Sequence, residues 1–148
     1  MVKTIAIGCD PNAVDLKKVI MQHLEAKGLN CEDFGSDDPI YANVAFAVAE
    51  AVASGKHSRG ILLCGTGIGV CLAANKVKGA YAATCTDPYS AERSVLSNNC
   101  NIMTIGSQVT GPEVAKKLVD IWIEAEYVPG GRSEPKIQRI YDYAKDKS

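Results

Sequence analysis

The feature that most constrains the fold is a short apolar run that ends in a glycine-rich turn. Residues 59–70 read RGILLCGTGIGV, and a segment of small residues continues to Lys76. The apolar run predicts a buried strand, the alternating glycines predict a tight turn, and the small residues predict a helix. Glycine lets backbone N–H groups approach a ligand, and a helix N-terminus favours negative charge. Cys64 would then lie beside an anion site; alternatively, it only fills buried space and the glycines only form the turn.

The remainder of the chain alternates between strand-like and helix-like patterns. Apolar segments predict strands at residues 4–9, 29–34, 60–64, 80–84 and 102–105. Apolar residues at helical spacing predict helices at residues 13–27, 41–53, 69–76, 88–97, 112–124 and 134–145. This alternation predicts an α/β fold: a Rossmann-like, doubly wound parallel sheet of five strands, in a single domain over residues 1–148 with a C-terminal helix.

Composition excludes several classes of function. A net charge of −1 gives no electrostatic basis for binding nucleic acid or a membrane surface. No apolar segment is long enough to span a bilayer, and the first residues run into a strand instead of a signal peptide. The six cysteines show no paired spacing, so no metal site is predicted. They are expected to be reduced thiols in the cytoplasm.

Parallel sheets of this kind bind ligands at the carboxyl ends of their strands. This rule selects Asp10, Asp87 and residues 64–69, each of which follows a predicted strand. His23 falls inside the first helix and His57 in a polar loop before the third strand, so both are expected on the surface. A cysteine beside N–H donors suits aldose–ketose isomerisation, in which one base moves a proton between neighbouring carbons through an enediolate. A helix N-terminus would stabilise the thiolate that such a base requires.

The segment CGTGIG, followed by AANK at residues 73–76, resembles the type B ribose-5-phosphate isomerase family, which includes the galactose-6-phosphate isomerase subunits. Further matching segments are IAIGCD at residues 5–10, DPYSA at 87–91, NNCNI at 98–102, IGS at 105–107 and GGR at 130–132. The resemblance covers nearly the whole chain in order. It implies an aldose–ketose isomerase without a cofactor, acting by default on ribose 5-phosphate and ribulose 5-phosphate.

The resemblance also implies roles for individual residues. Cys64 would be the proton-transfer base, and Thr66 would lie close to the substrate as a second catalytic residue. Substrate-binding positions would be Asp10, Gly65, Gly67, Ile68, Gly69, Asn98, Arg132 and Lys136. Asp10 would hold a sugar hydroxyl, or would only cap the first helix. Arg132 would bind phosphate, and Asn98 would reach the substrate across a dimer interface.

Several positions depart from the family pattern. Pro11 and Ser97 each replace a histidine, the second of which is thought to assist opening of the sugar ring. Gln108 and Lys136 each replace an arginine, and Asp38 replaces a tyrosine in a loop that looks short. Fewer arginines predict weaker or relocated phosphate binding. Without a ring-opening histidine, the chain is predicted to act on an open-chain substrate, and a four-carbon sugar 4-phosphate cannot close a furanose ring.

Alternatives remain at this stage. The substrate could be ribose 5-phosphate, a tetrose phosphate or an unphosphorylated sugar, and the chain could be a non-catalytic subunit of an isomerase of unlike chains. A dinucleotide-binding oxidoreductase is disfavoured, because Gly65, Gly67 and Gly69 follow GxGxG spacing instead of GxGxxG. The expected assembly is a homodimer or homotetramer with shared active sites, in which the Ser97–Asn98 segment faces the Cys64 loop of a partner.

Overall fold

The computed structural model describes residue 2 and residues 4–147, which form an α/β fold. The strands are β1 (Thr4–Cys9), β2 (Asn30–Asp33), β3 (Arg59–Cys64), β4 (Ala82–Thr84) and β5 (Ile102–Gly106). The helices are α1 (Val14–Ala26), α2 (Tyr41–Ala53), α3 (Ile68–Ala74), α4 (Pro88–Leu96), α5 (Pro112–Glu124) and α6 (Glu134–Lys147), with a 3₁₀ turn at Pro11–Ala13. The predicted elements are therefore all present and in the predicted order.

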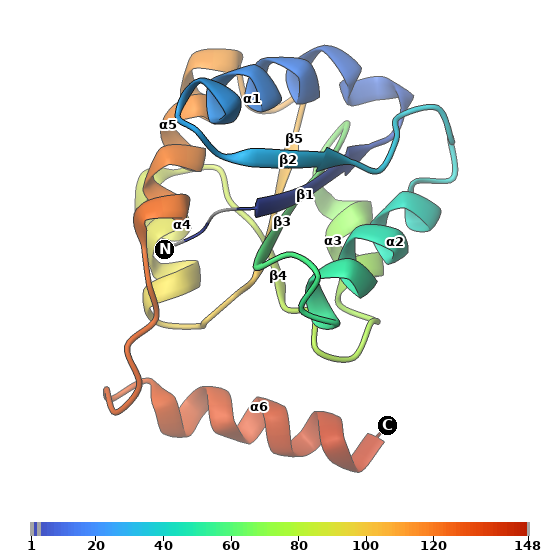
Figure 1. Ribbon diagram of the computed structural model, residues 1–148. Helices are drawn as coiled ribbons and strands as arrows, with labels where there is room; N and C mark the ends of the chain where they lie inside the picture. Colours follow the sequence, from blue (N-terminus) through green and yellow to red (C-terminus); the bar gives the residue numbers. More distant parts are fainter. Residues whose placement is uncertain (1, 3, 148) are drawn as a thin grey trace.

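The sheet is parallel throughout, with strand order β2-β1-β3-β5-β4. Helices α1, α4 and α5 cover one face, and α2 and α3 cover the other (Figure 1). Strands β2 and β3 lie on opposite sides of β1. The helices that follow the neighbouring strands β1 and β3, α1 and α3, therefore pack on opposite faces of the sheet. Ligands bind at such a switch point in open parallel sheets, and here it lies between Asp10 and Cys64.

Two apolar layers hold the sheet in place. One contains Trp122 of α5 and Ile7 of β1, both fully buried. The other contains Val48 of α2 and Leu62 of β3, also fully buried. Because both faces are covered, the strand sequences are nearly continuous apolar runs, and this is why alternation did not appear in them.

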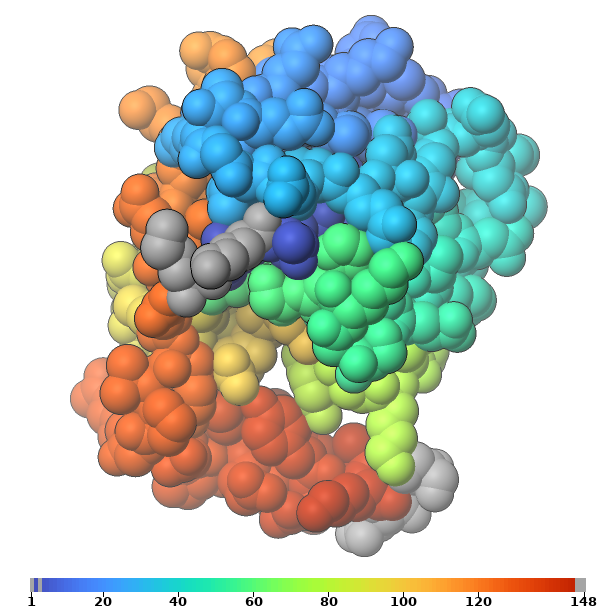
Figure 2. Space-filling model, in the orientation of Figure 1, coloured from blue at the N-terminus to red at the C-terminus, as the bar shows by residue number. Residues whose placement is uncertain are grey.

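Helix α6 lies apart from the sheet, along one side of the molecule (Figures 1 and 2). It is anchored by Ile137, which is buried, and by Tyr141, whose ring meets the edge of Tyr81 with centroids 5.0 Å apart. Asn99, which follows α4, donates a hydrogen bond to the Tyr141 hydroxyl over 3.3 Å. These contacts place α6 near the amino ends of β4 and β5, opposite the edge at which Cys64 ends β3.

Boundaries differ from the sequence prediction where side chains intervene. Strand β4 begins at Ala82, two residues later than predicted. The N–H of Tyr81 donates to Oδ1 of Asn101 over 2.8 Å, and the N–H of Ala80 donates to the carbonyl of Val77. Both groups are therefore unavailable to the sheet.

Candidate active site

A pocket of about 470 Å³ opens at the switch point between β1 and β3. Its wall includes six of the predicted site residues: Asp10, Cys64, Gly65, Thr66, Ile68 and Gly69. Tyr41 and Leu72 complete one side of it. We call this the Cys64 pocket.

Cys64 is the last residue of β3 and is held by the backbone of the loop that follows it. Only 5% of the residue is exposed, and Sγ accepts a hydrogen bond from the N–H of Gly67 over 3.1 Å. The local geometry therefore provides a thiol at the pocket wall together with a backbone N–H group directed at its sulfur.

Gly67 is required at this position by both its conformation and its surroundings. Its φ of +79° is in the left-handed region, and a Cβ there would lie 2.9 Å from the carbonyl carbon of Ile105. Its own carbonyl accepts hydrogen bonds from the hydroxyls of Thr104 (2.7 Å) and Thr84 (3.1 Å). These two threonines were not predicted, because no sequence pattern indicates that β4 and β5 reach the loop after β3. They fix the loop that presents Cys64.

Thr66 and Asp10 line the same pocket as Cys64. The Thr66 hydroxyl accepts a hydrogen bond from the N–H of Ile68 over 3.2 Å, and the residue is exposed toward the pocket. Asp10 is 5% exposed, and its carboxylate accepts hydrogen bonds from the N–H (3.0 Å) and the side-chain amide (3.1 Å) of Asn12. Asp10 thus caps the 3₁₀ turn Pro11–Ala13 that precedes α1, instead of α1 itself, and the same residue lines the pocket.

Four of the remaining thiols are unsuited to act as bases. Burial raises the pKa of Cys9 and Cys31 to about 11 and that of Cys100 to about 12. Burial also raises the pKa of Cys85. These thiols are protonated at neutral pH, and none of them lines the Cys64 pocket.

The expectation that both histidines lie on the surface is wrong for His57. Its side chain is only 10% exposed, its Nε2 lies 2.7 Å from Oε1 of Glu32, and its ring meets the edge of Phe34. The loop before β3 folds back onto β2, and this contact covers the ring. His23 is partly exposed and lies 2.7 Å from Oδ1 of Asp120. Neither histidine lines the Cys64 pocket.

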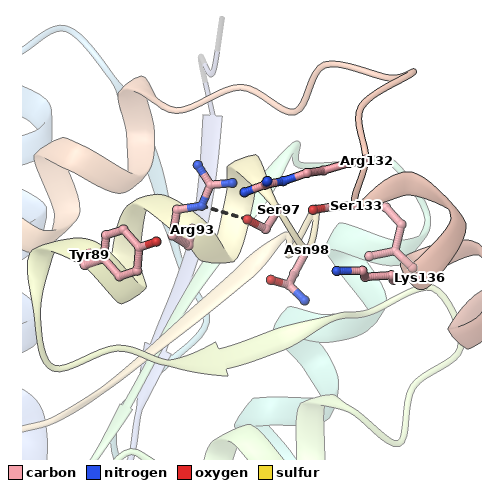
Figure 3. A pocket seen from close by; sticks show the side chains of 8 residues that line it. Tyr89, Arg93, Ser97, Asn98, Arg132, Ser133 and Lys136 are labelled. Atoms are coloured by element: carbon pink, nitrogen blue, oxygen red, sulfur yellow. Dashed lines mark hydrogen bonds between the residues drawn. The ribbon is translucent and has the colours of Figure 1, made fainter.

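The remaining predicted residues, Asn98, Arg132 and Lys136, gather in a second pocket of about 580 Å³ (Figure 3). This pocket lies on the outer face of α4, between that helix and the turn that leads to α6. We call it the Arg132 pocket. Within one chain it does not include Cys64, because residues 97–101 lie between α4 and the amino end of β5, whereas Cys64 lies at the carboxyl end of β3.

Arg93 also lines the Arg132 pocket and was missed by the sequence prediction. Its Nε donates a hydrogen bond to the hydroxyl of Ser97 over 2.7 Å. The available signal was its spacing: it precedes Ser97 by four residues, so both side chains lie on one face of a helix.

Within residue 2 and residues 4–147, no group of three His, Cys, Asp or Glu side chains is arranged to hold a metal ion. In the same part of the chain, no helix is both long and apolar enough to cross a membrane.

Comparison with known proteins identifies close relatives. Residues 5–140 match the model of the family described as ribose/galactose isomerase. The chain is 49% identical over 144 residues to a Pectobacterium atrosepticum protein named D-erythrulose-4-phosphate isomerase, with 95% of this chain and 94% of that protein covered. It is 43% identical over 141 residues to ribose-5-phosphate isomerase B of Escherichia coli, with 93% and 94% covered. The structure of ribose-5-phosphate isomerase B from Clostridium thermocellum superimposes with a TM-score of 0.92 at 40% identity, covering 98% of this chain and 99% of that one.

Proposed function

The chain belongs to the ribose/galactose isomerase family of sugar-phosphate aldose–ketose isomerases, and from this premise we propose that it interconverts erythrose 4-phosphate and erythrulose 4-phosphate, with Cys64 as the base. The observation that supports the chemistry is the position of Cys64, which lines a pocket and whose Sγ accepts a hydrogen bond from the N–H of Gly67.

In the proposed reaction, the Cys64 thiolate removes the proton from C2 of the aldose, and the carbonyl at C1 becomes an enediolate oxygen. Backbone N–H groups of the loop that follows Cys64, other than those of Gly67 and Ile68, stabilise that oxygen, because they are fixed before the charge develops. The hydroxyl proton passes from the oxygen at C2 to the oxygen at C1, the thiol returns the abstracted proton to C1, and the oxygen at C2 becomes the ketose carbonyl. One base serves both steps, so no cofactor is needed. Asp10 and Thr66 bind hydroxyl groups of the sugar.

The choice of a four-carbon substrate rests on Ser97. Proton transfer to a ring oxygen requires an acid of suitable pKa within hydrogen-bond reach, and a serine hydroxyl lacks such a pKa. The Ser97 oxygen also already accepts a hydrogen bond from Nε of Arg93. A tetrose 4-phosphate needs no ring opening, since its only hydroxyl able to close a furanose ring carries the phosphate. The name of the Pectobacterium relative agrees with this choice.

Ribose 5-phosphate is the second candidate, favoured by the names of the E. coli relative and the C. thermocellum structure. The two are separated by measuring kcat/KM for erythrose 4-phosphate and for ribose 5-phosphate with the wild type and with Ser97→His. We expect the wild type to prefer the tetrose phosphate by at least about tenfold. A wild type that prefers the pentose phosphate by such a margin would exclude the four-carbon assignment.

We further propose that the active site is shared between two copies of the chain. The Cys64 pocket holds no cation for a phosphate, whereas the Arg132 pocket holds three and no base. Around the Cys64 pocket, Ile40 (61%), Ile68 (58%) and Leu72 (62%) are exposed, and a second copy would cover them. A two-fold arrangement brings each Cys64 pocket against the partner's Arg132 pocket.

Complementation tests the shared site. Cys64→Ala and Arg132→Ala, each impaired alone, are mixed, unfolded together and refolded. If each site takes Cys64 from one chain and Arg132 from the other, a mixed dimer has one intact site, and activity recovers to about a quarter of the wild-type value. No recovery, or an active monomer by analytical ultracentrifugation, would contradict sharing.

A further inference from the structure

Arg93 is held in one position but has no partner for its charge. It lies on α4, partly buried, and its Nε donates to the Ser97 hydroxyl one helical turn later. Among the described residues, no other hydrogen bond and no ion pair engages this guanidinium. Its two terminal amino groups are therefore available to a ligand.

The charged side chains that line the Arg132 pocket are all positive. Figure 3 shows the Arg93 and Arg132 side chains pointing toward one another across Ser97, with Lys136 beside Asn98. No aspartate or glutamate lines this pocket, and none of the three cations forms an ion pair within the described chain. Like charges placed together repel, so the arrangement is stabilised when an anion lies between them.

We propose that Arg93, oriented by Ser97, binds the phosphate of the substrate as one arm of a two-arginine clamp with Arg132. This deepens the proposed function and rests on it for the identity of the anion as a sugar phosphate. Guanidinium groups suit the task because each presents paired N–H donors that match two phosphate oxygens. Lys136 supplies a third positive charge.

In the clamp, Arg93 takes the place of an arginine that is missing at position 108. Gln108 stands where the family resemblance leads one to expect an arginine, and its neutral side chain lies against Gly65 at the Cys64 loop. Arg93 supplies positive charge on α4 instead. One phosphate-binding cation is thus relocated along the chain, and the hydroxyl of Ser97 serves to orient an arginine.

Ser97 is a positioning residue in this scheme. The hydrogen bond from Nε of Arg93 to the Ser97 hydroxyl leaves only the two terminal amino groups of the guanidinium free and fixes the plane in which they lie. Less conformational freedom is therefore lost when phosphate binds. A purely structural role for the pair, at the C-terminal end of α4, would instead affect only stability.

Binding of inorganic phosphate, followed by isothermal titration calorimetry, tests the clamp without requiring turnover. Arg93→Met should weaken phosphate binding about 10- to 100-fold, as expected for removing a charged hydrogen-bonding group, and Arg93→Lys should weaken it less. The matched control is Arg139→Met, which removes the same charge from α6 at a position outside the pocket, where Arg139 stacks on Tyr143. The control should bind phosphate as the wild type does.

Ser97 variants test the orientation step. Ser97→Ala should raise KM for sugar phosphates several-fold with kcat nearly unchanged, since ground state and transition state lose the same contact. Ser97→Thr, which keeps the hydroxyl, should restore KM, and adding Ser97→Ala to Arg93→Met should have no further effect. If Arg93→Met fails to fold, Arg93→Lys and Ser97→Ala provide the same comparison.

The outcomes separate the clamp from the proposed function. Phosphate binding that is equally tight in Arg93→Met and wild type would overturn the clamp, even if the wild type isomerises erythrose 4-phosphate. Weakened phosphate binding in Arg93→Met would support it, even if the wild type turns over neither sugar phosphate, in which case the proposed function fails instead.

Discussion

In the Cys64 pocket the proposed base is fixed by backbone, whereas in the Arg132 pocket two of the proposed phosphate-binding groups, Arg132 and Lys136, are exposed side chains. Cys64 is 5% exposed and is held by the Gly67 N–H, while the Gly67 carbonyl is held by two threonine hydroxyls. Arg132 and Lys136 are exposed and lie at the start of a helix that stands apart from the sheet. Replacing a buried residue of the Cys64 loop disturbs packing, but replacing an exposed side chain such as Arg132 costs little stability.

This difference would allow the proposed reaction to be retained while the substrate changes. The predicted motif at residues 64–69 is complete, and the departures at Ser97 and Lys136 both line the Arg132 pocket. In the proposed mechanism, proton transfer depends on the first pocket and recognition of the phosphate depends on the second. The predictions below test this division of roles.

The largest expected effect is the loss of the base. Cys64→Ala should lower kcat by about 100- to 10,000-fold, because a positioned acid–base group contributes that much to proton transfer. Cys71→Ala is the matched control, since it removes a thiol from α3 that lines no part of the pocket. Near-normal turnover of Cys64→Ala, measured by NMR of the sugar phosphates, would contradict the assignment and direct attention to Asp10.

A smaller effect is expected from altering the backbone that supports Cys64. Gly67→Ala should lower the free energy of unfolding by about 2–3 kcal/mol, because it combines a left-handed φ with a clash against the Ile105 backbone. Gly28→Ala has a similar φ of +85° but no atom within 4 Å, and should cost about 1 kcal/mol. Urea unfolding measures both. Equal costs would show that the Cys64 loop is not fixed by packing.

The next effect concerns the Arg132 pocket. Arg132→Ala should raise KM for phosphorylated substrates about tenfold, leave an unphosphorylated analogue unaffected and leave the melting temperature unchanged. Lys136→Arg should lower KM, because a guanidinium can bind two phosphate oxygens at once. Equal losses on both kinds of substrate would mean that Arg132 is structural, and the comparison of the two pockets would fail.

The smallest effect is a difference in which thiols iodoacetamide labels near neutral pH. Since burial raises the pKa of Cys9 and Cys31 to about 11 and that of Cys100 to about 12, these thiols are protonated below those values and react slowly with iodoacetamide. At about pH 8, labelling should fall by one thiol in Cys64→Ala, and substrate should protect that thiol in the wild type. Mass spectrometry identifies the sites. Labelling of Cys9 at that pH would show that the sheet opens.

The elements themselves were predictable because they are encoded locally. Helices Tyr41–Ala53 and Pro112–Glu124 begin and end where the apolar spacing predicted, and Asp87 caps α4 by accepting the N–H of Ser90 over 2.8 Å. The strand, turn and helix around Cys64 followed from an apolar run and three glycines. Such patterns indicate which side of a helix or strand faces the core, and they can be identified within a few consecutive residues.

What the tertiary structure decided is which of these elements meet. The sequence alone did not establish that β5 lies between β3 and β4, and this order is what brings Thr84 and Thr104 to the carbonyl of Gly67. It also did not establish that Arg93 and Arg132 face each other, or that His57 is buried against Glu32. These contacts join segments distant in the chain. Their geometry depends on the packing of whole elements, because apolar periodicity specifies that a face is buried but not which partner buries it.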